Sequence, residues 1–559
     1  MKTRTQRNLF STLALILLAS LLLTACVPAA APAPAAPAAP AATAAPAAPA
    51  TAAPVQPAAG ADKKPLVVLI PTEPNTLDPA VNYDYNGAPF LGMVYETLVR
   101  AVGEKDPQLV PGLAESWETS PDGLVYTFKL KPGAKFHDGS PVNAEAVKFS
   151  FERLLKLGMG AVANFSDIDK IEAVDDTTVR FTLKVPFTQF LPALSSLWGP
   201  AIVNPALVKA HEKDGDLGQA WLAENDAGSG PYKLGKWDRS QQITLERDPN
   251  YWGGWGDKYI DTIIVRPIGE STTMRLMLEK GDADVAIGLT PEDADALAKT
   301  PGVTVPEYLA GSIVEMRLNT TKKPLDDPKV RQALNYSFDY EQGVEGVMSG
   351  HAKPMDSIMA SGMPGHYQPS FTYKKDLDKA KQLLAEAGYP DGGFPLDYVW
   401  ISGLERDRRL GEMWQADLKK LGIDLNIREM PIATWWEAQA SPETAPQTFM
   451  GGWGNDYADA TQQVWAMYYS GNWPPAGSNY YFYKNEKVDK LLEAARIEQD
   501  QAKKDQLYQE ATEIIYTEAP EVWVMQPNER VALRDNVKGY AYNFSYTFNY
   551  FPFEKMYRE

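Results

Sequence analysis

Cysteine and histidine are both scarce in this sequence. The single cysteine, Cys26, lies close to the N-terminus, and four histidines are dispersed along 559 residues. The chain after residue 26 therefore has no partner thiols for an internal disulfide or a thiolate metal cluster. A histidine-rich metal site is also not expected, because such sites need several imidazole ligands close together.

Positive charge is in deficit as well. The chain has 54 Lys and Arg residues against 72 Asp and Glu residues, which gives a formal net charge of -18. Proteins that bind a nucleic-acid backbone rely on clustered basic side chains that release counterions. We therefore expect no nucleic-acid partner, and the acidity indicates solubility rather than a particular function.

Long apolar runs are missing after the N-terminal segment, and that segment has the pattern of an export signal. Three basic residues among the first seven precede an apolar run at 9–23, which is short for a membrane span. The run ends in Leu-Thr-Ala before Cys26, and this ending resembles the bacterial lipobox, whose cysteine is diacylated. We expect residues 1–25 to be a lipoprotein signal peptide and Cys26 to be the lipid attachment site. An ordinary signal peptide or an N-terminal membrane anchor is the alternative.

Large apolar side chains are almost absent from the next segment, which is rich in Ala and Pro up to about residue 61. Such a composition cannot bury enough apolar surface to offset the entropy of ordering. We expect residues 26–61 to form a stalk behind the lipidated cysteine. In the polyproline II limit of about 3.1 Å per residue, it would reach up to roughly 100 Å.

The remaining sequence alternates predicted strands and helices. Strands are predicted from continuous or alternating apolar residues at 66–70, 125–130 and 179–184. Helices are predicted from apolar residues at helical spacing, and in two cases from a glycine stop, at 144–157, 376–387 and 405–421. This alternation favours an α/β fold.

Motifs for catalysis or cofactor binding are missing. The chain has no G-x-S-x-G, H-E-x-x-H or G-x-G-x-x-G pattern. Residues 230–236 resemble a phosphate-binding loop, but Trp237 stands where Ser or Thr would coordinate magnesium, and Pro231 removes an amide. We therefore expect a protein that is not an enzyme and that holds no metal or other cofactor. A catalytic pair built from carboxylates distant in sequence stays open.

Aromatic residues, in contrast, crowd one stretch whose composition is otherwise typical of loops. The stretch contains Trp453, Tyr457, Trp465, Tyr468, Tyr469, Trp473, Tyr480, Tyr481, Phe482 and Tyr483. An aromatic core under irregular loops is one interpretation. As a group, these residues favour the wall of a cavity whose ligand is held by flat faces and a few polar groups.

Several short motifs occur together and in a fixed order. They are LAESW at 113–117, SPDGLVYTFKL at 120–130, GAKFHDG at 133–139, GSGPY at 228–232, RDPNYW at 247–252, GDADVA at 281–286, AKQLLAEAGYP at 380–390 and GGWGNDY at 451–457. This series closely resembles the signature of the family 5 extracellular solute-binding proteins, the oligopeptide, dipeptide and nickel receptors of bacterial ABC importers. The resemblance covers nearly all of the chain after the stalk.

The resemblance implies a periplasmic-binding-protein fold of two lobes joined at a hinge, with a small extra domain inserted in lobe I. By similarity, lobe I comprises 62–104, 228–308 and 526–559, the inserted subdomain comprises 105–227, and lobe II comprises 309–525. The hinge is expected near 309–314 and 524–528. Ligand contacts to both lobes would stabilise the closed state, which the importer recognises.

The resemblance also implies an anchor for the ligand's amino terminus. In peptide-binding members an Asp in the Gly-Trp loop pairs with this ammonium group, and Asp456 stands at the matching position. Trp453 and Tyr457 flank it and are expected to shield it from water. Trp473 is expected on the same cavity wall.

For the ligand's carboxylate, dipeptide receptors use an arginine from a helix of lobe II. Arg408 and Arg409 resemble that position, and the planar guanidinium suits a carboxylate because it can bond both oxygens. The same two arginines, together with Arg406, fit a solvated helix face equally well.

We therefore expect an extracytoplasmic substrate-binding lipoprotein, periplasmic or at the cell surface and anchored to the membrane by its lipid. It is expected to capture short peptides as a monomer and to deliver them to the permease subunits of an ABC importer. An oligosaccharide receptor of the same family is the alternative, with Trp435, Trp436, Trp453 and Trp473 as stacking platforms. A nickel or nickel-chelate receptor fits the few histidines less well, and a secreted hydrolase is a distant alternative.

Overall fold

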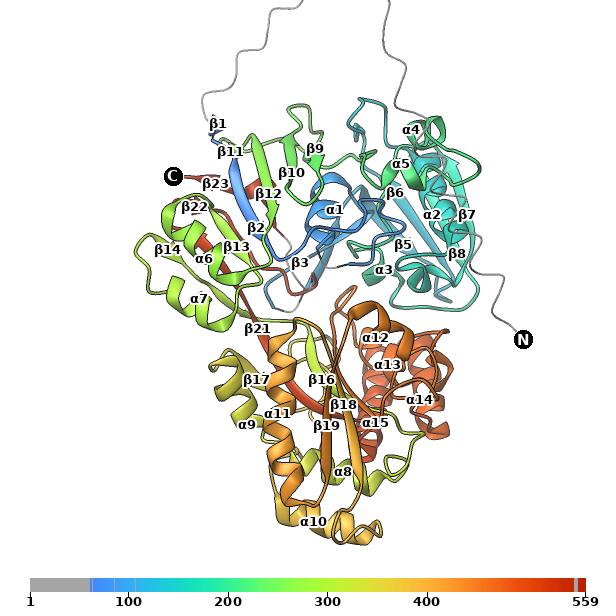
Figure 1. Ribbon diagram of the computed structural model, residues 1–559. Coiled ribbons are helices and arrows are strands. Elements are labelled where there is room, and N and C mark those ends of the chain that lie inside the picture. The colour runs from blue at the N-terminus through green and yellow to red at the C-terminus, as the bar shows by residue number, and fades with distance from the viewer. Residues whose placement is uncertain (1–60, 63, 85, 106, 547–550) are drawn as a thin grey trace, which may run out of the picture. The chain divides into compact units, whose positions relative to one another are not determined.

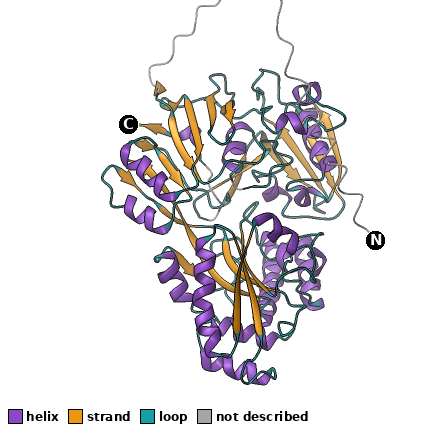
Figure 2. Ribbon diagram, viewed as in Figure 1, coloured by secondary structure: helices purple, strands orange, loops and turns teal. Residues whose placement is uncertain are grey.

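The computed structural model describes residues 61–62, 64–84, 86–105, 107–546 and 551–559. Cys26, the expected signal peptide and all but the last residue of the expected stalk lie outside these residues. The described part of the chain mixes helices and strands throughout (Figure 2). No helix within it is both long and apolar enough to cross a membrane.

The six elements predicted from periodicity are present, with ends that shift by one residue at most. The strands are β2 (Leu66–Ile70), β6 (Val125–Leu130) and β8 (Thr178–Leu183), and the helices are α2 (Ala144–Leu157), α10 (Leu377–Glu386) and α11 (Glu405–Lys420). Local chemistry fixes some of these ends. The side chain of Asn143 caps the first turn of α2, and Gly158 ends this helix in a left-handed conformation.

The largest sheet has thirteen strands, ten of which form one continuous path. In spatial order these are β19 (Asp424–Met430), β18 (Pro395–Ile401), β20 (Thr448–Trp453), β16 (Ile313–Leu318), β21 (Glu521–Arg534), β13 (Val285–Ile287), β2, β12 (Thr262–Pro267), β10 (Gln242–Arg247) and β9 (Tyr232–Asp238). We call the half from β13 to β9 lobe I and the half from β16 to β19 lobe II.

Strand β21 belongs to both lobes (Figure 1). Its first residues pair with β16, where Met525 lies opposite Val314. Its last residues pair with β13, where Leu533 lies opposite Val285. Between them, Asn528 pairs with Leu309 of β15 (Glu307–Leu309). One continuous strand therefore connects the two lobes, alongside the segment that leads from β15 to β16.

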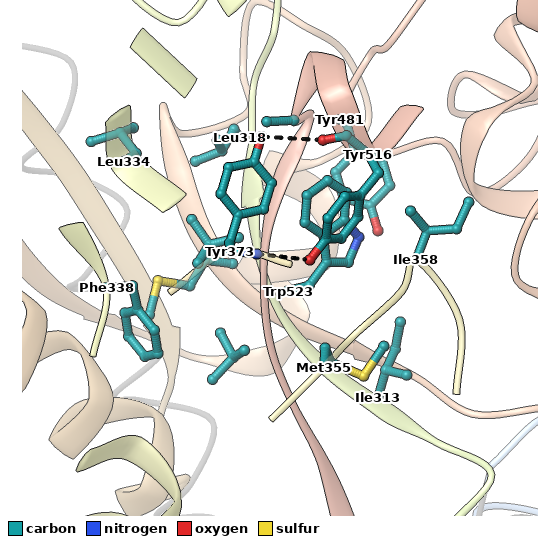
Figure 3. Packing of buried hydrophobic residues seen from close by; sticks show 14 of the residues in the cluster. Ile313, Leu318, Leu334, Phe338, Met355, Ile358, Tyr373, Tyr481, Tyr516 and Trp523 are labelled. Atoms are coloured by element: carbon teal, nitrogen blue, oxygen red, sulfur yellow. Dashed lines mark hydrogen bonds between the residues drawn. The ribbon is translucent and has the colours of Figure 1, made fainter. Parts of the chain in front are cut away.

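Each lobe has its own hydrophobic core. The core of lobe I is built on β2, β10, β12 and β13, and that of lobe II on β16, α8 (Pro328–Ser337), α11 and α15 (Gln501–Glu518). In lobe II, the Tyr516 and Trp523 rings stack 4.5 Å apart, and the Tyr373 hydroxyl donates to the Tyr516 carbonyl oxygen at 3.2 Å (Figure 3). This packing holds the start of β21 firmly within lobe II.

A separate four-stranded antiparallel sheet lies between the strands of lobe I in sequence. Its order is β5 (Ala114–Thr119), β6, β8 and β7 (Ile168–Asp175), and α2 packs on it (Figure 2). Phe128, Phe151 and Phe181 are central to its core, with ring centroids 4.9 to 5.8 Å apart. Tyr457 of lobe II is buried in this same core. We call residues 114–183, which contain this sheet and α2, the insert. Tyr457 fixes one point of its contact with lobe II.

Candidate ligand-binding site

The loop after β20 carries Asp456, the central acidic residue of the site. Two glycines of β20 let this strand pack closely against β16. A Cβ atom on Gly451 would lie 2.5 Å from Nε of Arg317, and one on Gly452 would lie 2.8 Å from the Ile313 carbonyl oxygen. Only glycine therefore lets β20 approach β16 this closely without rearrangement. The loop that follows places Asp456 where lobe II meets the rest of the molecule.

Asp456 is buried, with 6% of its surface exposed. Its carboxylate accepts hydrogen bonds from the Tyr83 hydroxyl at 3.0 and 3.1 Å and from Nδ2 of Asn164 at 2.7 Å. Both donors are neutral, and within the described residues no Lys, Arg or His forms an ion pair with Asp456. Burial therefore raises the pKa of this carboxyl group to about 6, although the two hydrogen bonds oppose the shift.

Two cavities meet at Asp456. Cavity A has a volume of about 480 Å³ and lies mainly against β16, β20 and α12 (Ile432–Ala438). Cavity B has a volume of about 370 Å³ and lies between the insert and the aromatic stretch of lobe II. The residues that line both are Tyr83, Trp453, Asp456 and Ser478. The buried carboxyl group thus lies at the junction of two spaces of the size that small ligands occupy.

Cavity A is walled largely by apolar side chains. They are Ile313, Val314, Ile401, Leu404, Ile432, Trp435, Trp436, Met450, Trp453 and Tyr480. Four large side chains exposed over two fifths or more of their surface lie on this wall, namely Tyr83 (52%), Leu404 (42%), Ile432 (57%) and Trp436 (51%). Exposed apolar surface concentrated around one cavity indicates a binding site rather than chance exposure.

Arg317 forms part of the floor of cavity A, but its hydrogen-bonding capacity is used inside the protein. Its guanidinium donates to Glu315 at 2.8 Å, to Oε1 of Gln439 at 2.8 Å and to the Gly452 carbonyl oxygen at 3.2 Å. Its carbon centre also lies 4.6 Å from the Tyr480 ring centroid. Arg317 therefore holds the floor together, and the charged pair with Glu315 is buried as a unit.

Arg406, at the start of α11, is the arginine of that helix that lines cavity A. Its Nε donates to Asp407 at 2.7 Å, and about a third of its side chain is exposed. Arg408 is instead paired with Glu405 and Glu412 on the same helix. Arg409 donates to Glu292 at 3.2 Å and to the Gly346 carbonyl oxygen at 2.6 Å. Neither Arg408 nor Arg409 is among the described residues that line cavities A and B.

The predicted aromatic residues divide between the cavity walls and the core. Trp453 lines both cavities, and Tyr457 and Trp465 line cavity B. Trp473 is half-buried, its Nε1 donates to the Tyr483 carbonyl oxygen at 2.9 Å, and it is not among the described residues that line cavities A and B. Four others, Tyr468, Tyr481, Phe482 and Tyr483, are buried in the interior. The aromatic stretch therefore contributes one subset of its residues to the cavity walls and another to the core.

Polar contacts also join the insert to lobe II around cavity B. Arg496 of α14 (Glu486–Ile497) pairs with Asp167 of the insert and lies 4.9 Å from the Trp465 ring centroid. Nε2 of Gln462 donates to Oδ1 of Asn164 at 3.3 Å.

Within the described residues, no group of three or more His, Cys, Asp or Glu side chains is arranged to hold a metal ion.

Comparison with known proteins gives consistent matches. A sequence model of the bacterial extracellular solute-binding proteins, family 5 (middle part), matches residues 108–475. The probable D,D-dipeptide-binding periplasmic protein DdpA of Escherichia coli K12 is 36% identical over 497 residues, 88% of this chain and 94% of its own length. The glutathione-binding protein GsiB of Salmonella typhi is 32% identical, over 82% of this chain and 88% of its own length.

Solved structures match over a similar extent. The periplasmic binding protein DppA from Helicobacter pylori, in complex with the peptide STSA, has a TM-score of 0.77 and 30% identity. The match covers 89% of this chain and 98% of that one. The oligopeptide-binding protein AppA from Bacillus subtilis, in complex with a nonapeptide, has a TM-score of 0.76 at 24% identity, with 89% and 99% covered. The described chain therefore has the two-lobed fold of periplasmic binding proteins.

Proposed function

The chain belongs to the bacterial extracellular solute-binding proteins of family 5, and we propose that it captures short peptides outside the cytoplasm and delivers them to the permease of an ABC importer. The observation that carries this proposal is the buried Asp456 carboxylate, which has only neutral hydrogen-bond donors and faces two cavities. A buried charge needs an opposite charge, and the ammonium group of a peptide supplies one. Peptide or glutathione binding in the names of its relatives supports the same ligand class.

Arg406 is the proposed partner for the other end of the ligand. It lines cavity A together with Asp456, so a peptide whose ammonium group meets Asp456 can direct its carboxylate toward Arg406. The planar guanidinium can bond both carboxylate oxygens, which a Lys ammonium cannot do with the same geometry. In this proposal Arg406 takes the role that we expected for Arg408 or Arg409.

Closure of the two lobes around the ligand is the proposed mechanism, and catalysis is not part of it. Asp456 of lobe II accepts hydrogen bonds from Tyr83, on the lobe I side, and from Asn164 of the insert. A ligand ammonium at Asp456 would strengthen this junction and so favour the closed state. We also propose that the lobes and the inserted subdomain have the residue boundaries expected from the sequence. The protein is proposed to be a monomer that is attached to the membrane through lipid on Cys26.

An oligosaccharide is the second candidate ligand, because Trp435, Trp436 and Trp453 all line cavity A and could stack on sugar rings. A titration followed by tryptophan fluorescence, with a pool of di- to tetrapeptides and a pool of cello-oligosaccharides, separates the two candidates. We expect saturable binding of peptides, no binding of sugars, and no hydrolysis of either pool. Binding of the sugars alone would refute the peptide proposal.

A further inference from the structure

Cavity A contains three buried hydrogen-bonding groups that have no partner among the described residues. They are Oγ of Ser312, Nε1 of Trp435 and Nε1 of Trp453. Ser312 and Trp435 are themselves almost fully buried, with 2% and 4% of their surface exposed. Buried polar groups in proteins are paired in the large majority of cases, so three unpaired ones on a single cavity wall require an explanation.

The three groups come from separate elements that converge on the cavity. Ser312 directly precedes β16, Trp435 lies in α12, and Trp453 ends β20. The two indole groups can only donate hydrogen bonds, and the serine hydroxyl can donate as well. A ligand that reaches these donors must bring acceptors of its own, because a donor left unpaired next to a bound ligand lowers affinity.

The wall around these donors is apolar, and this constrains the rest of the ligand. Ile432 and Trp436 are exposed to the cavity, and burying them against a bulky apolar group would remove their surface from water. The floor charge, Arg317, is already paired within the protein. The cavity thus offers neutral donors within an apolar surface, which is the complement of a peptide carbonyl next to a large apolar side chain.

We propose that Ser312, Trp435 and Trp453 are ligand-binding residues that donate hydrogen bonds to the ligand's carbonyl oxygens, and that cavity A selects short peptides with bulky apolar side chains. This inference rests on the proposed function and specifies its substrate class. The donors fix the peptide backbone, whereas Ile432 and Trp436 contact the side chain.

Calorimetric titration of the purified protein with the dipeptides Phe-Leu and Ala-Ala tests the size preference. We expect Phe-Leu to bind about 10-fold to 100-fold more tightly, because it buries more apolar surface. Equal affinity of the two dipeptides would overturn the inference while leaving the proposed function standing. Binding of cello-oligosaccharides but of neither dipeptide would overturn both.

The donors are tested separately, by removing their N–H or O–H groups. The single amide carbonyl of Phe-Leu has two lone pairs, so one or two of the variants Ser312→Ala, Trp435→Phe and Trp453→Phe should weaken Phe-Leu binding about 5-fold to 50-fold. Trp436→Phe is the comparison variant, because it trims a ring on the same wall whose indole is not a buried unpaired donor. It reports the loss of ring packing alone, and a donor variant should lose more affinity than it does. Replacing Trp435 or Trp453 by 3-benzothienylalanine keeps the ring size and removes only the N–H, so a loss of packing cannot mimic the result.

A thioamide analogue of Phe-Leu completes the test, because sulfur accepts hydrogen bonds less well than oxygen. It should bind the wild-type protein more weakly than Phe-Leu does, and at least one of the three variants should no longer distinguish the two ligands. If all three variants and the benzothienyl proteins bind Phe-Leu as tightly as the wild-type protein, the assignment of these donors is refuted.

Discussion

The charge of Asp456 should couple ligand affinity to pH. Burial raises the pKa of this carboxyl group in the empty protein to about 6, and an ammonium ligand binds the ionised form. With that pKa, roughly a tenth of the protein is ionised at pH 5, whereas most of it is ionised at pH 7. Affinity for Phe-Leu should therefore fall about tenfold from pH 7 to pH 5, a range in which the peptide's amino group stays protonated.

Asp456→Asn isolates this charge, because it keeps the size of the side chain and part of its hydrogen bonding. Removing the counter-charge of a buried ammonium should cost roughly 2 to 4 kcal/mol, which corresponds to about 30-fold to 1,000-fold in affinity. The variant should also bind with the same affinity at pH 5 and pH 7. Calorimetry at both pH values measures both effects.

The same charge should lower the stability of the empty protein. The pKa is raised above the value of 3.8 that is normal for Asp, so the folded state holds its proton more tightly than the unfolded state does. The free energy of unfolding should therefore fall as pH rises from about 4 to 6 and stay reduced above that, by roughly 2 to 3 kcal/mol. Asp456→Asn should raise the melting temperature of the empty protein at pH 8 and leave it nearly unchanged at pH 4. A variant that melts below the wild-type protein at pH 8, or wild-type affinity that is independent of pH, would refute this account of Asp456.

Three further predictions concern other positions. In calorimetry, Arg406→Gln should weaken binding of Phe-Leu about 5-fold to 20-fold but should not change the affinity for Phe-Leu amide, which has no carboxylate. Arg408→Gln breaks only ion pairs on its own helix and should change the affinity for neither peptide. Gly451→Ala should lower the free energy of unfolding in urea by about 1 to 3 kcal/mol, because its Cβ would lie 2.5 Å from the buried Arg317. The control Gly269→Ala, whose Cβ meets nothing within 4 Å, should lower it by at most about 0.5 kcal/mol. Cys26→Ser should release the protein from membranes in fractionated cells, and retention at the same yield would contradict the lipid anchor.

Local patterns were sufficient to predict much of the fold. Strand β6 and helix α11 bury residues at the period of their own secondary structure, so their positions follow from a short stretch of sequence. The partners of Asp456 could not be found in this way. Tyr83 and Asn164 are 373 and 292 residues away in sequence, and no local motif singles them out.

The sequence contains a signal that separates Arg408 from the other arginines of α11. Glu405 and Glu412 stand three residues before and four residues after Arg408, which is the spacing of side-chain pairs on one helix face. This spacing predicts that Arg408 stays on its own helix surface. Arg406, in contrast, lies four residues before the buried Leu410. The position of Arg406 at cavity A could not be predicted from this spacing, because it depends on how α11 packs on the sheet of lobe II.

The central claim is that a ligand ammonium group pairs with Asp456, and the most direct test is to remove that charge from the ligand. Calorimetric titration at pH 7 compares Phe-Leu with N-acetyl-Phe-Leu on the wild-type protein and on Asp456→Asn. We predict that acetylation weakens binding to the wild-type protein by about 30-fold or more and has a much smaller effect on the variant. Equal affinity of the wild-type protein for the two peptides would contradict the claim and favour an uncharged ligand such as an oligosaccharide.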